Sequence, residues 1–280
     1  MNTDVAPGVV RRLFAFGLRR LRLDAGFSQA QAAKEMRCSQ GRVANLEAQR
    51  NLPRLEFLEK LLRLYGADSQ IPRYTEMLDL AEKRSWWDGL DETREVAGFD
   101  VFLGLEEGAS KIETCDPLLI PGLLQTENYA RTLMVGRGAS AIDRAVKLRM
   151  RRQETLLSPN PVHFWTTIDE YALDREIGTS ETRRNQLDHL LEMSAYPHVH
   201  IQILPRTAGV HPGLVGPFTI MSFPLGDDPG VVYIETRIKA VWFEEPAEID
   251  QYTQEMNHMR SLALSPEQSR ALIEQKRKEV

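Results

Sequence analysis

Residues 18–53 read LRRLRLDAGFSQAQAAKEMRCSQGRVANLEAQRNLP, and this stretch decides the fold of the N-terminal part of the chain. Ser28 and Gln31 have the spacing of a capping box, in which each side chain satisfies a backbone group of the other residue, so a helix starts here. A tight turn follows, and Ser39 caps the next helix. Two short helices separated by a few residues, inside an all-helical unit of this size, predict a helix-turn-helix.

Helices are also expected on both sides of this pair. Apolar residues repeat with helical spacing over 9–25, and Gly26 ends that helix. Pro53 is placed to open a further amphipathic helix, rich in leucine. Residues 69–95 begin as a helix and become polar around 86–89, where we place a domain junction.

The rest of the chain predicts a mixed domain, because helical periodicity alternates with short runs of β-branched and aromatic residues. Helices are expected over 97–111, 126–157, 180–194, 246–263 and 266–278, and strands over 162–168, 199–204, 218–223 and 231–235. The expected fold class is mixed α+β, with an N-terminal all-α helix-turn-helix domain followed by a larger α/β domain. We expect a helix-turn-helix domain over 1–75, a helical linker over 76–95 and a regulatory or dimerisation domain over 96–280.

Composition is that of an ordinary globular protein, with 42% hydrophobic and 27% charged residues among 280. No apolar run approaches the roughly 20 residues that a membrane span needs. The first residues lack the basic and apolar regions of a secretory signal. The two cysteines, Cys38 and Cys115, exclude a disulfide framework and favour a reducing compartment. We therefore expect a cytoplasmic protein without membrane contact.

Charge is distributed unevenly along the chain. Residues 1–75 carry 13 Lys or Arg and 7 Asp or Glu, a net charge of +6, whereas the whole chain has a net charge of −5. The remaining residues therefore carry a net charge of −11. A basic small domain joined to an acidic larger one is typical of a DNA-binding head on a body that avoids DNA, although a spread of this size also arises by chance.

Residue types and their spacing within 18–53 resemble the helix-turn-helix family of phage repressors and their bacterial relatives, often called the XRE family. The matching positions are Gly26, Ser28, Gln29, Ala33, Ser39, Val43, Leu46 and Glu47. The resemblance implies that the second of the two short helices enters the major groove of DNA. It also implies a homodimer on a double-stranded, pseudo-palindromic operator.

The DNA-contacting residues that this resemblance implies are Gln29, Ser39, Gln40, Gly41, Arg42 and Asn45. Gln40 and Asn45 can bond adenine bidentately, whereas Gly41 has no side chain, so one usual base contact is missing. Gln29 and the helix N-terminus beside it are expected at phosphate. Arg42 is left open between phosphate, base and solvent, and mere solvent exposure is the alternative for Gln40 and Asn45.

Arg22 is expected to have a structural role and not to touch DNA. In similar proteins the residue seven positions before the glutamine of the second helix is an arginine that pairs with a glutamate of the third helix. The corresponding residues here are Arg22 and Glu47. The resemblance therefore implies a buried ion pair between the first and third helices.

A second resemblance covers nearly all of residues 97–270. It includes Glu106, residues 169–170 and residues 203–205, and its most specific part is the segment IPGLLQT at 120–126 with Tyr129. These positions resemble the C-terminal domain of actinobacterial regulators called WhiJ-like or Scr1-family antitoxin-like proteins. The resemblance implies a developmental or antibiotic-related regulator and a small companion protein.

Polar residues of this domain that stand in apolar surroundings include Glu106, Gln125, Glu170, Gln186 and Glu235. The candidate ligand contacts are Glu106, Gln125, Tyr129, Glu170 and Glu235, with core packing as the alternative for Tyr129. A buried carboxylate needs a partner, which is either a structural arginine, such as Arg131 or Arg175, or a ligand. A small-molecule site would lie between residues 120–126 and the strand ends. No phosphate loop, metal-ligand spacing or nucleophile motif is recognised, so we expect no metal, no cofactor, no catalytic residue and no enzyme.

The sequence favours two functions. One is a sequence-specific DNA-binding transcription regulator whose C-terminal domain dimerises and binds an effector, either a small molecule or a small partner protein. The alternative is an antitoxin-like protein whose acidic body captures a small basic companion and whose DNA binding regulates its own operon. A third, an enzyme fused to a DNA-binding head, would require turnover of a substrate by residues 76–280.

Overall fold

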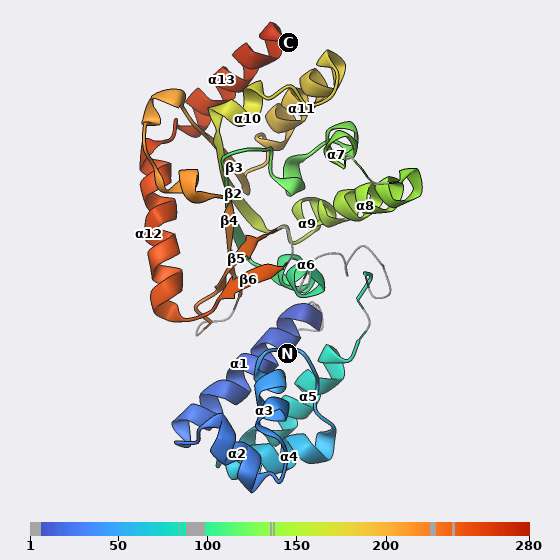
Figure 1. The fold of residues 1–280 in the computed structure, drawn as a ribbon, viewed down its shortest axis with the longest axis vertical. Helices are drawn as coiled ribbons and strands as arrows, with labels where there is room; N and C mark the ends of the chain where they lie inside the picture. The colour runs from blue at the N-terminus through green and yellow to red at the C-terminus, as the bar shows by residue number, and fades with distance from the viewer. Residues whose placement is uncertain are drawn as a thin grey trace. The chain divides into compact units, whose positions relative to one another are not determined.

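The computed structural model of the protein describes residues 7–83, 85–87, 99–134, 136, 138–224, 228–236 and 239–280. The chain forms two compact units, Met1–Asp88 and Gly89–Val280 (Figure 1).

Unit 1 is helical throughout its described residues. Its helices are α1 (Pro7–Asp24), α2 (Gln29–Glu35), α3 (Gln40–Glu47), α4 (Leu55–Leu64) and α5 (Ile71–Ala81), with a 3₁₀ turn at Asp68–Gln70. The expected helix-turn-helix is formed by α2 and α3. Pro53 was expected to open α4, but it precedes the helix. Arg54 is the N-cap, and α4 starts at Leu55.

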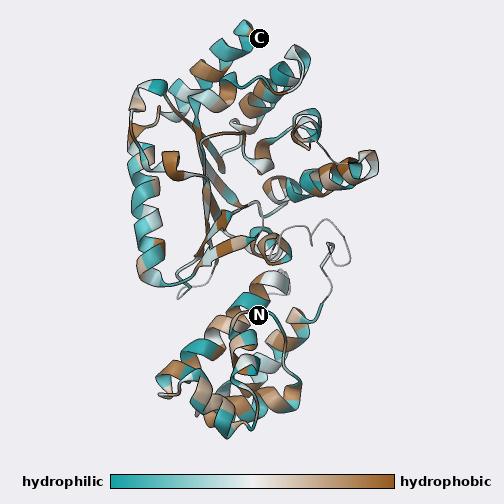
Figure 2. Cartoon of the chain, viewed as in Figure 1, coloured by the Kyte–Doolittle hydropathy of each residue, from teal (hydrophilic) through white to brown (hydrophobic). Residues whose placement is uncertain are grey.

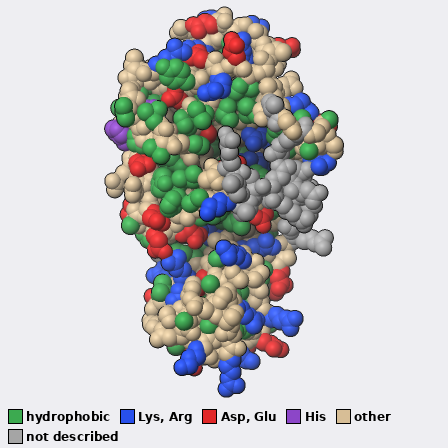
Figure 3. Space-filling model, in the orientation of Figure 1, with side chains coloured by type: hydrophobic (Ala, Val, Ile, Leu, Met, Phe, Trp, Pro, Cys, Tyr) green, Lys and Arg blue, Asp and Glu red, His purple; other side chains and the backbone are tan. Residues whose placement is uncertain are grey.

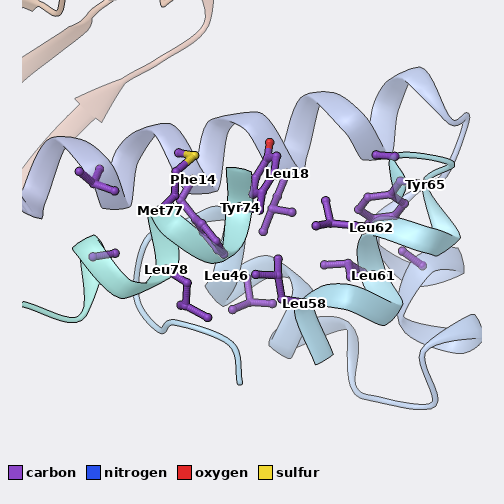
Figure 4. Packing of buried hydrophobic residues seen from close by; sticks show 14 residues of the cluster. Phe14, Leu18, Leu46, Leu58, Leu61, Leu62, Tyr65, Tyr74, Met77 and Leu78 are labelled. Carbon is purple, nitrogen blue, oxygen red and sulfur yellow. The ribbon is translucent and has the colours of Figure 1, made fainter. Parts of the chain in front are cut away.

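The core of unit 1 is built from the apolar faces of its helices (Figure 4). It contains Phe14, Leu18, Leu46, Leu58, Leu61, Leu62, Tyr65, Tyr74, Met77 and Leu78. Residues 76–81, expected to begin a linker, instead complete α5, because Met77, Leu78 and Ala81 continue the apolar face that Tyr74 starts. Residues 84 and 88–95 of that expected linker lie outside the described residues.

Unit 2 is a mixed domain, which confirms the expected α+β class. Its strands are β1 (Lys111–Asp116), β2 (His163–Asp169), β3 (Val199–Leu204), β4 (Phe218–Ser222), β5 (Val231–Glu235) and β6 (Ala240–Phe243). Its α-helices are α6 (Phe99–Gly108), α7 (Glu127–Leu133), α8 (Ala139–Arg152), α9 (Glu154–Leu157), α10 (Glu170–Asp174), α11 (Ser180–Met193), α12 (Pro246–Leu262) and α13 (Pro266–Glu279).

Within the described residues the strands form one sheet in the order β3-β2-β1-β4-β5-β6. The pairs β1–β2 and β2–β3 are parallel, and β4, β5 and β6 add antiparallel strands beyond β1. Both parallel crossovers step in the same direction along the sheet, so their helices lie on the same face. Figure 1 shows α7, α8, α9 and α11 on that face and α12 on the other.

Apolar side chains hold the layers together. Ile249, Met256 and Met259 of α12 pack on Phe218 and Val232 of the sheet. In Figure 2 the strands are mostly hydrophobic, whereas α12 is largely hydrophilic along its length. Only one stripe of α12 is buried, as expected for a helix that covers the sheet on one side and faces water on the other.

The secondary structure departs from expectation at a few places in unit 2. The helix expected over 97–111 ends at Gly108, and the predicted 126–157 helix is divided into α7, α8 and α9. Strands β1 and β6 and the short helix α10 were not expected. β1 has the sequence KIETCD. Because it contains several polar residues, it lacks the run of β-branched and aromatic residues that predicts a central strand.

Candidate nucleic-acid interface and ligand pocket

The two short helices of unit 1 start at the caps that the sequence predicts. Ser28 Oγ accepts a hydrogen bond from the Gln31 backbone N at 3.2 Å, and Gln31 Oε1 accepts one from the Ser28 backbone N at 2.8 Å. This is the predicted capping box. Ser39 Oγ accepts from the Arg42 backbone N at 3.3 Å and caps α3. Ser39 therefore has a structural role at the position where a DNA contact was also expected.

The turn between α2 and α3 contains a residue in the left-handed region. Arg37 has φ of 49°, and the Cys38 backbone N donates to Ala33 O at 2.9 Å to close the turn. A side chain at positive φ is strained, and only glycine adopts this conformation without a Cβ penalty.

Arg37→Gly should therefore stabilise unit 1 by about 0.5–1 kcal/mol, because it removes this strain at the expense of some extra freedom in the unfolded chain. The midpoint of thermal unfolding measures the change. Arg37→Ala is the matched control, since it removes the same side chain and keeps the Cβ. An equal gain in both variants would contradict a backbone cause.

α3 has a buried face and a polar outer face. Val43 and Leu46 are 1% and 3% exposed, which fixes the helix against unit 1. Gln40 and Gly41 are exposed, and Asn45 is half-buried. Asn45 Oδ1 accepts a long hydrogen bond from Arg50 Nη1 at 3.4 Å, and within the described residues the Asn45 amide nitrogen donates to no protein group.

Arg42 has a defined partner instead of standing free in solvent. Its guanidinium carbon lies 3.9 Å from the ring centroid of Phe57 on α4. This cation–π contact holds the side chain beside α3. Arg42 is also exposed, so its N–H groups remain accessible for an anion at the edge of the outer face.

The expected ion pair between Arg22 and Glu47 is confirmed. Arg22 Nε donates to Glu47 Oε1 at 2.6 Å and Arg22 Nη2 donates to Glu47 Oε2 at 3.0 Å. The two side chains are only 6% and 5% exposed. The pKa of Arg22 is raised, chiefly by its hydrogen bond to Glu47. The pair joins α1 to α3 and sets the angle of α3.

Gln29 also contacts this pair. Its Nε2 donates to Glu47 Oε2 at 2.9 Å. An amide group carries two N–H donors, so one remains for the phosphate contact that the sequence predicts. Glu47 thus connects Arg22 in the interior with Gln29 at the start of α2.

A basic groove lies beside α3, and sequence reasoning found only one of its residues. The groove has a volume of about 730 Å³ and is lined by Arg37, Arg42, Arg54, Lys60 and Arg63 together with Glu35 and Glu56. Figure 3 shows several Lys and Arg side chains projecting from the visible surface of unit 1. The signal in the sequence was the positive charge of the first 75 residues, which does not say where the charges meet.

Unit 2 contains a cavity of about 540 Å³ on the sheet face opposite α12. Its lining includes three of the candidate ligand contacts, Glu106, Gln125 and Glu235, and part of the segment 120–126. Tyr129 and Glu170 are not part of the lining. The predicted position of a small-molecule site, between residues 120–126 and the strand ends, thus coincides with a cavity, while its occupation by a ligand stays a prediction.

Glu106 is paired within the protein. Arg152 of α8 donates through Nε to Glu106 Oε1 and through Nη2 to Glu106 Oε2, each at 2.7 Å. In this bidentate pair the Glu106 side chain is 5% exposed and the Arg152 side chain is 11% exposed. The expected partners, Arg131 and Arg175, are elsewhere: Arg131 is an exposed partner of Asp143, and Arg175 Nε donates to Leu118 O at 3.1 Å.

The segment 120–126 is mostly buried and contains a 3₁₀ turn at Gly122–Leu124, and side-chain amides form hydrogen bonds with its backbone. Gln125 Nε2 donates to Ile120 O at 2.6 Å, and Gln153 Nε2 donates to Gly122 O at 3.1 Å and Gln125 O at 2.6 Å. Gln186 Nε2 donates to Leu124 O at 2.7 Å. The polar residues of this segment therefore fix the wall of the cavity.

Tyr129 supports the same wall from behind. Its hydroxyl accepts a hydrogen bond from the Ile120 backbone N at 3.3 Å, and burial raises its pKa. Glu170 lies in a different place, where it pairs with Lys276 at 3.1 Å and accepts from the Arg206 backbone N at 3.1 Å. Glu235 is exposed, contrary to the expected buried position, and accepts from Tyr233 Oη at 3.1 Å.

Besides Arg152, two charged residues of the cavity were missed by sequence reasoning. Asp116, at the end of β1, and Arg149, on α8, both line it. Arg149 Nη1 donates to Gln125 Oε1 at 2.7 Å. A signal existed for Asp116, which is the last polar residue before the apolar run that leads into the segment 120–126.

In the part of the chain that the structure describes, no three His, Cys, Asp or Glu side chains are arranged to hold a metal ion. Among the same residues no helix has the length and apolar character to cross a membrane.

Comparison with known families assigns each unit. Residues 13–73 match the profile of a helix-turn-helix domain, which makes unit 1 the DNA-binding part of a regulator. Residues 99–275 match a domain of unknown function, DUF5753. Searches of curated proteins and of solved structures gave no significant match. Since the second match spans more than half of the 280 residues, the chain belongs to the DUF5753 family.

Proposed function

We propose that this protein is a sequence-specific transcription regulator of the XRE type, which reads a pseudo-palindromic operator through the outer face of α3. The observation that carries the proposal is the construction of this helix. Val43 and Leu46 anchor it, and Glu47 fixes its angle through Arg22. Gln40 and Asn45 are then presented on a rigid helix, as major-groove recognition requires.

The basic groove supports the same function. Arg37, Arg42, Arg54, Lys60 and Arg63 outnumber the two glutamates that also line it. Lys and Arg side chains beside a recognition helix neutralise phosphates, which gives affinity without sequence information. We assign the groove to the DNA backbone and Gln40, Gly41 and Asn45 to the bases.

Gln40→Ala and Asn45→Ala should each weaken binding to the operator by about 1–3 kcal/mol and relax the base preference at one position. The operator is first selected from a random duplex library with the full-length protein, and affinity is then measured by fluorescence anisotropy at fixed salt. Gln70→Ala, in the 3₁₀ turn of unit 1, is a control away from α3. If neither α3 substitution changes operator affinity, this interface is wrong.

We further propose that the protein is a homodimer, with unit 2 supplying most of the interface. One helix-turn-helix reads only a few base pairs, so two heads about 34 Å apart are needed for a specific site. Light scattering of the full chain at micromolar concentration should give twice the 31.9 kDa mass. A monomer both alone and on operator DNA would overturn this part of the proposal.

Unit 2 is proposed to bind an effector that changes operator affinity. The cavity of about 540 Å³ supports this role, because small-molecule sites have volumes of roughly 300–1,000 Å³ and a few polar groups in an apolar lining. The effector must bind the DNA-competent and incompetent forms with different affinity. The test is operator affinity with and without the small-molecule fraction of a host extract, where no change would refute effector control.

The second candidate is an antitoxin-like protein of the WhiJ or Scr1 type, acting in the cytoplasm and without enzymatic activity. The net charge of −11 outside residues 1–75 favours it, since an acidic surface steers a basic companion protein. Co-expression with a short basic protein from the neighbouring reading frame distinguishes the candidates. A stable complex that changes operator binding supports the antitoxin-like function, and its absence supports the small-molecule effector.

A further inference from the structure

The cavity of unit 2 lies where two strands end at the same edge of the sheet. β1 and β5 are both antiparallel to β4, which lies between them, so they run in the same direction. β1 ends at Asp116 and β5 ends at Glu235, and both side chains line the cavity. The topology thus brings two carboxylates to one opening.

The walls of the cavity are apolar and aromatic. Phe102 of α6, Phe164 of β2 and Tyr233 of β5 all contribute. Phe102 and Tyr233 are in contact, with ring centroids 4.4 Å apart. Flat apolar walls of this kind favour an apolar group of a ligand, and polar groups then set its orientation.

Three charged groups in the cavity have no ion-pair partner among the described residues: Asp116, Arg149 and Glu235. Glu235 is exposed and accepts a hydrogen bond from Tyr233 Oη at 3.1 Å. Among the described residues, the Asp116 carboxylate has no hydrogen-bond or ion-pair partner, and Arg149 has one side-chain hydrogen bond, to the neutral amide of Gln125. Glu106 and Arg152, in contrast, neutralise each other through two hydrogen bonds. Because solvent hydrates the exposed Glu235, Asp116 and Arg149 are the half-buried charges left for a ligand.

The pKa values of Asp116 and Arg149 are both shifted toward the neutral form of the side chain. Burial raises the pKa of Asp116 to about 7; Arg149 opposes this shift and Glu235 adds to it. Burial, with a contribution from Arg152, lowers the pKa of Arg149 to about 10. Both charged forms are thus disfavoured by their surroundings in the cavity, and a ligand that supplies the opposite charges would relieve this.

We propose that the cavity binds a small zwitterion of the amino-acid type, with its ammonium group at Asp116, its carboxylate at Arg149 and an apolar side chain among the aromatic walls. The proposal rests on the effector-binding role proposed for unit 2 and names the chemistry of the effector. An anion alone would leave Asp116 without a partner, and a cation alone would leave Arg149 without one.

The test uses four probes that share a phenyl ring on a short chain: phenylalanine, phenylpropionate, phenethylamine and phenylpropanamide. They are a zwitterion, an anion, a cation and a neutral molecule. Ligand-detected NMR titration of the full-length protein should give at least about tenfold tighter binding for phenylalanine than for the other three, since each charge adds a charge-assisted hydrogen bond. Equal affinities, or no binding of any probe at millimolar concentration, would overturn the proposal.

Charge-selective variants sharpen the test. Asp116→Asn should weaken phenylalanine binding about tenfold or more and make phenylpropionate the preferred probe, because Arg149 remains. Arg149→Gln should make phenethylamine the preferred probe. Asp143→Asn, an exposed carboxylate on α8, is the matched control and should leave all four affinities unchanged. Asp116→Asn variants that keep the wild-type order of affinities would refute the assignment.

Folding of these variants is checked by thermal unfolding. Asp116→Asn removes a half-buried carboxylate whose charged form is disfavoured, so the melting temperature of the variant should be higher than that of wild type at about pH 8. If Arg149→Gln unfolds because the contact with Gln125 is lost, Asp116→Asn alone still decides the test.

Binding should also depend on pH, because the ammonium group requires ionised Asp116. The groups that face this carboxylate from neighbouring elements are Arg149 and Arg152 of α8, Glu106 of α6 and Glu235 of β5. With a pKa of about 7, Asp116 is mostly protonated at about pH 6, so phenylalanine should bind about tenfold more weakly there than at about pH 8. Asp116→Asn should remove this dependence, and a wild-type affinity that does not change with pH would contradict the role of Asp116.

Failure of this inference is distinguishable from failure of the proposed function. If no probe binds and the extract fraction still shifts operator affinity, the zwitterion assignment is wrong and the effector function stands. If phenylalanine binds as described and operator affinity does not depend on Gln40 or Asn45, the pocket is correct and the DNA interface is wrong.

Discussion

Glu47→Ala is expected to destabilise unit 1 by about 3–5 kcal/mol and to weaken operator binding in parallel. The substitution leaves the Arg22 guanidinium, which is 6% exposed, without its counter-charge. It also releases Gln29 from the start of α2. Because the two units can unfold separately, calorimetry of the full chain is the suitable measurement, and the transition of unit 1 should move to a lower temperature.

Glu59→Ala is the matched control for this prediction. Glu59 pairs with Arg63 on α4 at 3.0 Å, and the side chains are 34% and 53% exposed, so its loss should cost no more than about 0.5 kcal/mol. Replacing both Arg22 and Glu47 by methionine and leucine should recover most of the stability. An effect of Glu47→Ala no larger than that of Glu59→Ala would show that the buried pair does not hold α3.

Glu106→Gln is expected to destabilise unit 2 by a similar amount, about 3–5 kcal/mol, because Arg152 would keep its charge in a buried site. The pKa of Arg152 is raised by Glu106, although burial acts against this. The guanidinium carbon also lies 5.0 Å from the centroid of Phe102, so the loss of order should reach the aromatic wall of the cavity.

Calorimetry of the full chain measures this change as a shift of the unit 2 transition to a lower temperature. Glu127→Gln removes a carboxylate from an exposed pair with Arg131 and should leave the unfolding midpoint where it is. Glu106→Gln should also weaken the binding of phenylalanine to the cavity. A variant as stable as wild type would mean that water reaches Arg152 and that the pair is not buried in solution.

The sequence predicts those parts of the fold that local patterns determine. Capping at Ser28 and Ser39 places α2 and α3, and β-branched runs place β2, β3 and β5. The pair Arg22–Glu47 was also predictable, because it follows from a family resemblance over a short stretch. Such features depend on residues a few positions apart or on a spacing that relatives share.

The remaining features depend on contacts distant in the chain. β1 is a central strand although it contains Glu113, which is buried because Arg260 of α12 pairs with it. No local pattern reveals a partner 147 residues away. In the cavity, Glu106 pairs with Arg152 and not with Arg131 or Arg175, because the fold brings Arg152 of α8 next to Glu106 of α6. Asp116 and Arg149 were missed for the same reason.

The sheet face beneath α12 also determines when unit 2 can be completed during synthesis. Phe218, Ile220 and Val232 remain open to water until residues 246–262 have left the ribosome. Unit 1 is complete far earlier, and domains fold as units in order of synthesis. A premature stop before Pro246 should therefore release a chain with a folded DNA-binding head and an uncovered, aggregation-prone sheet.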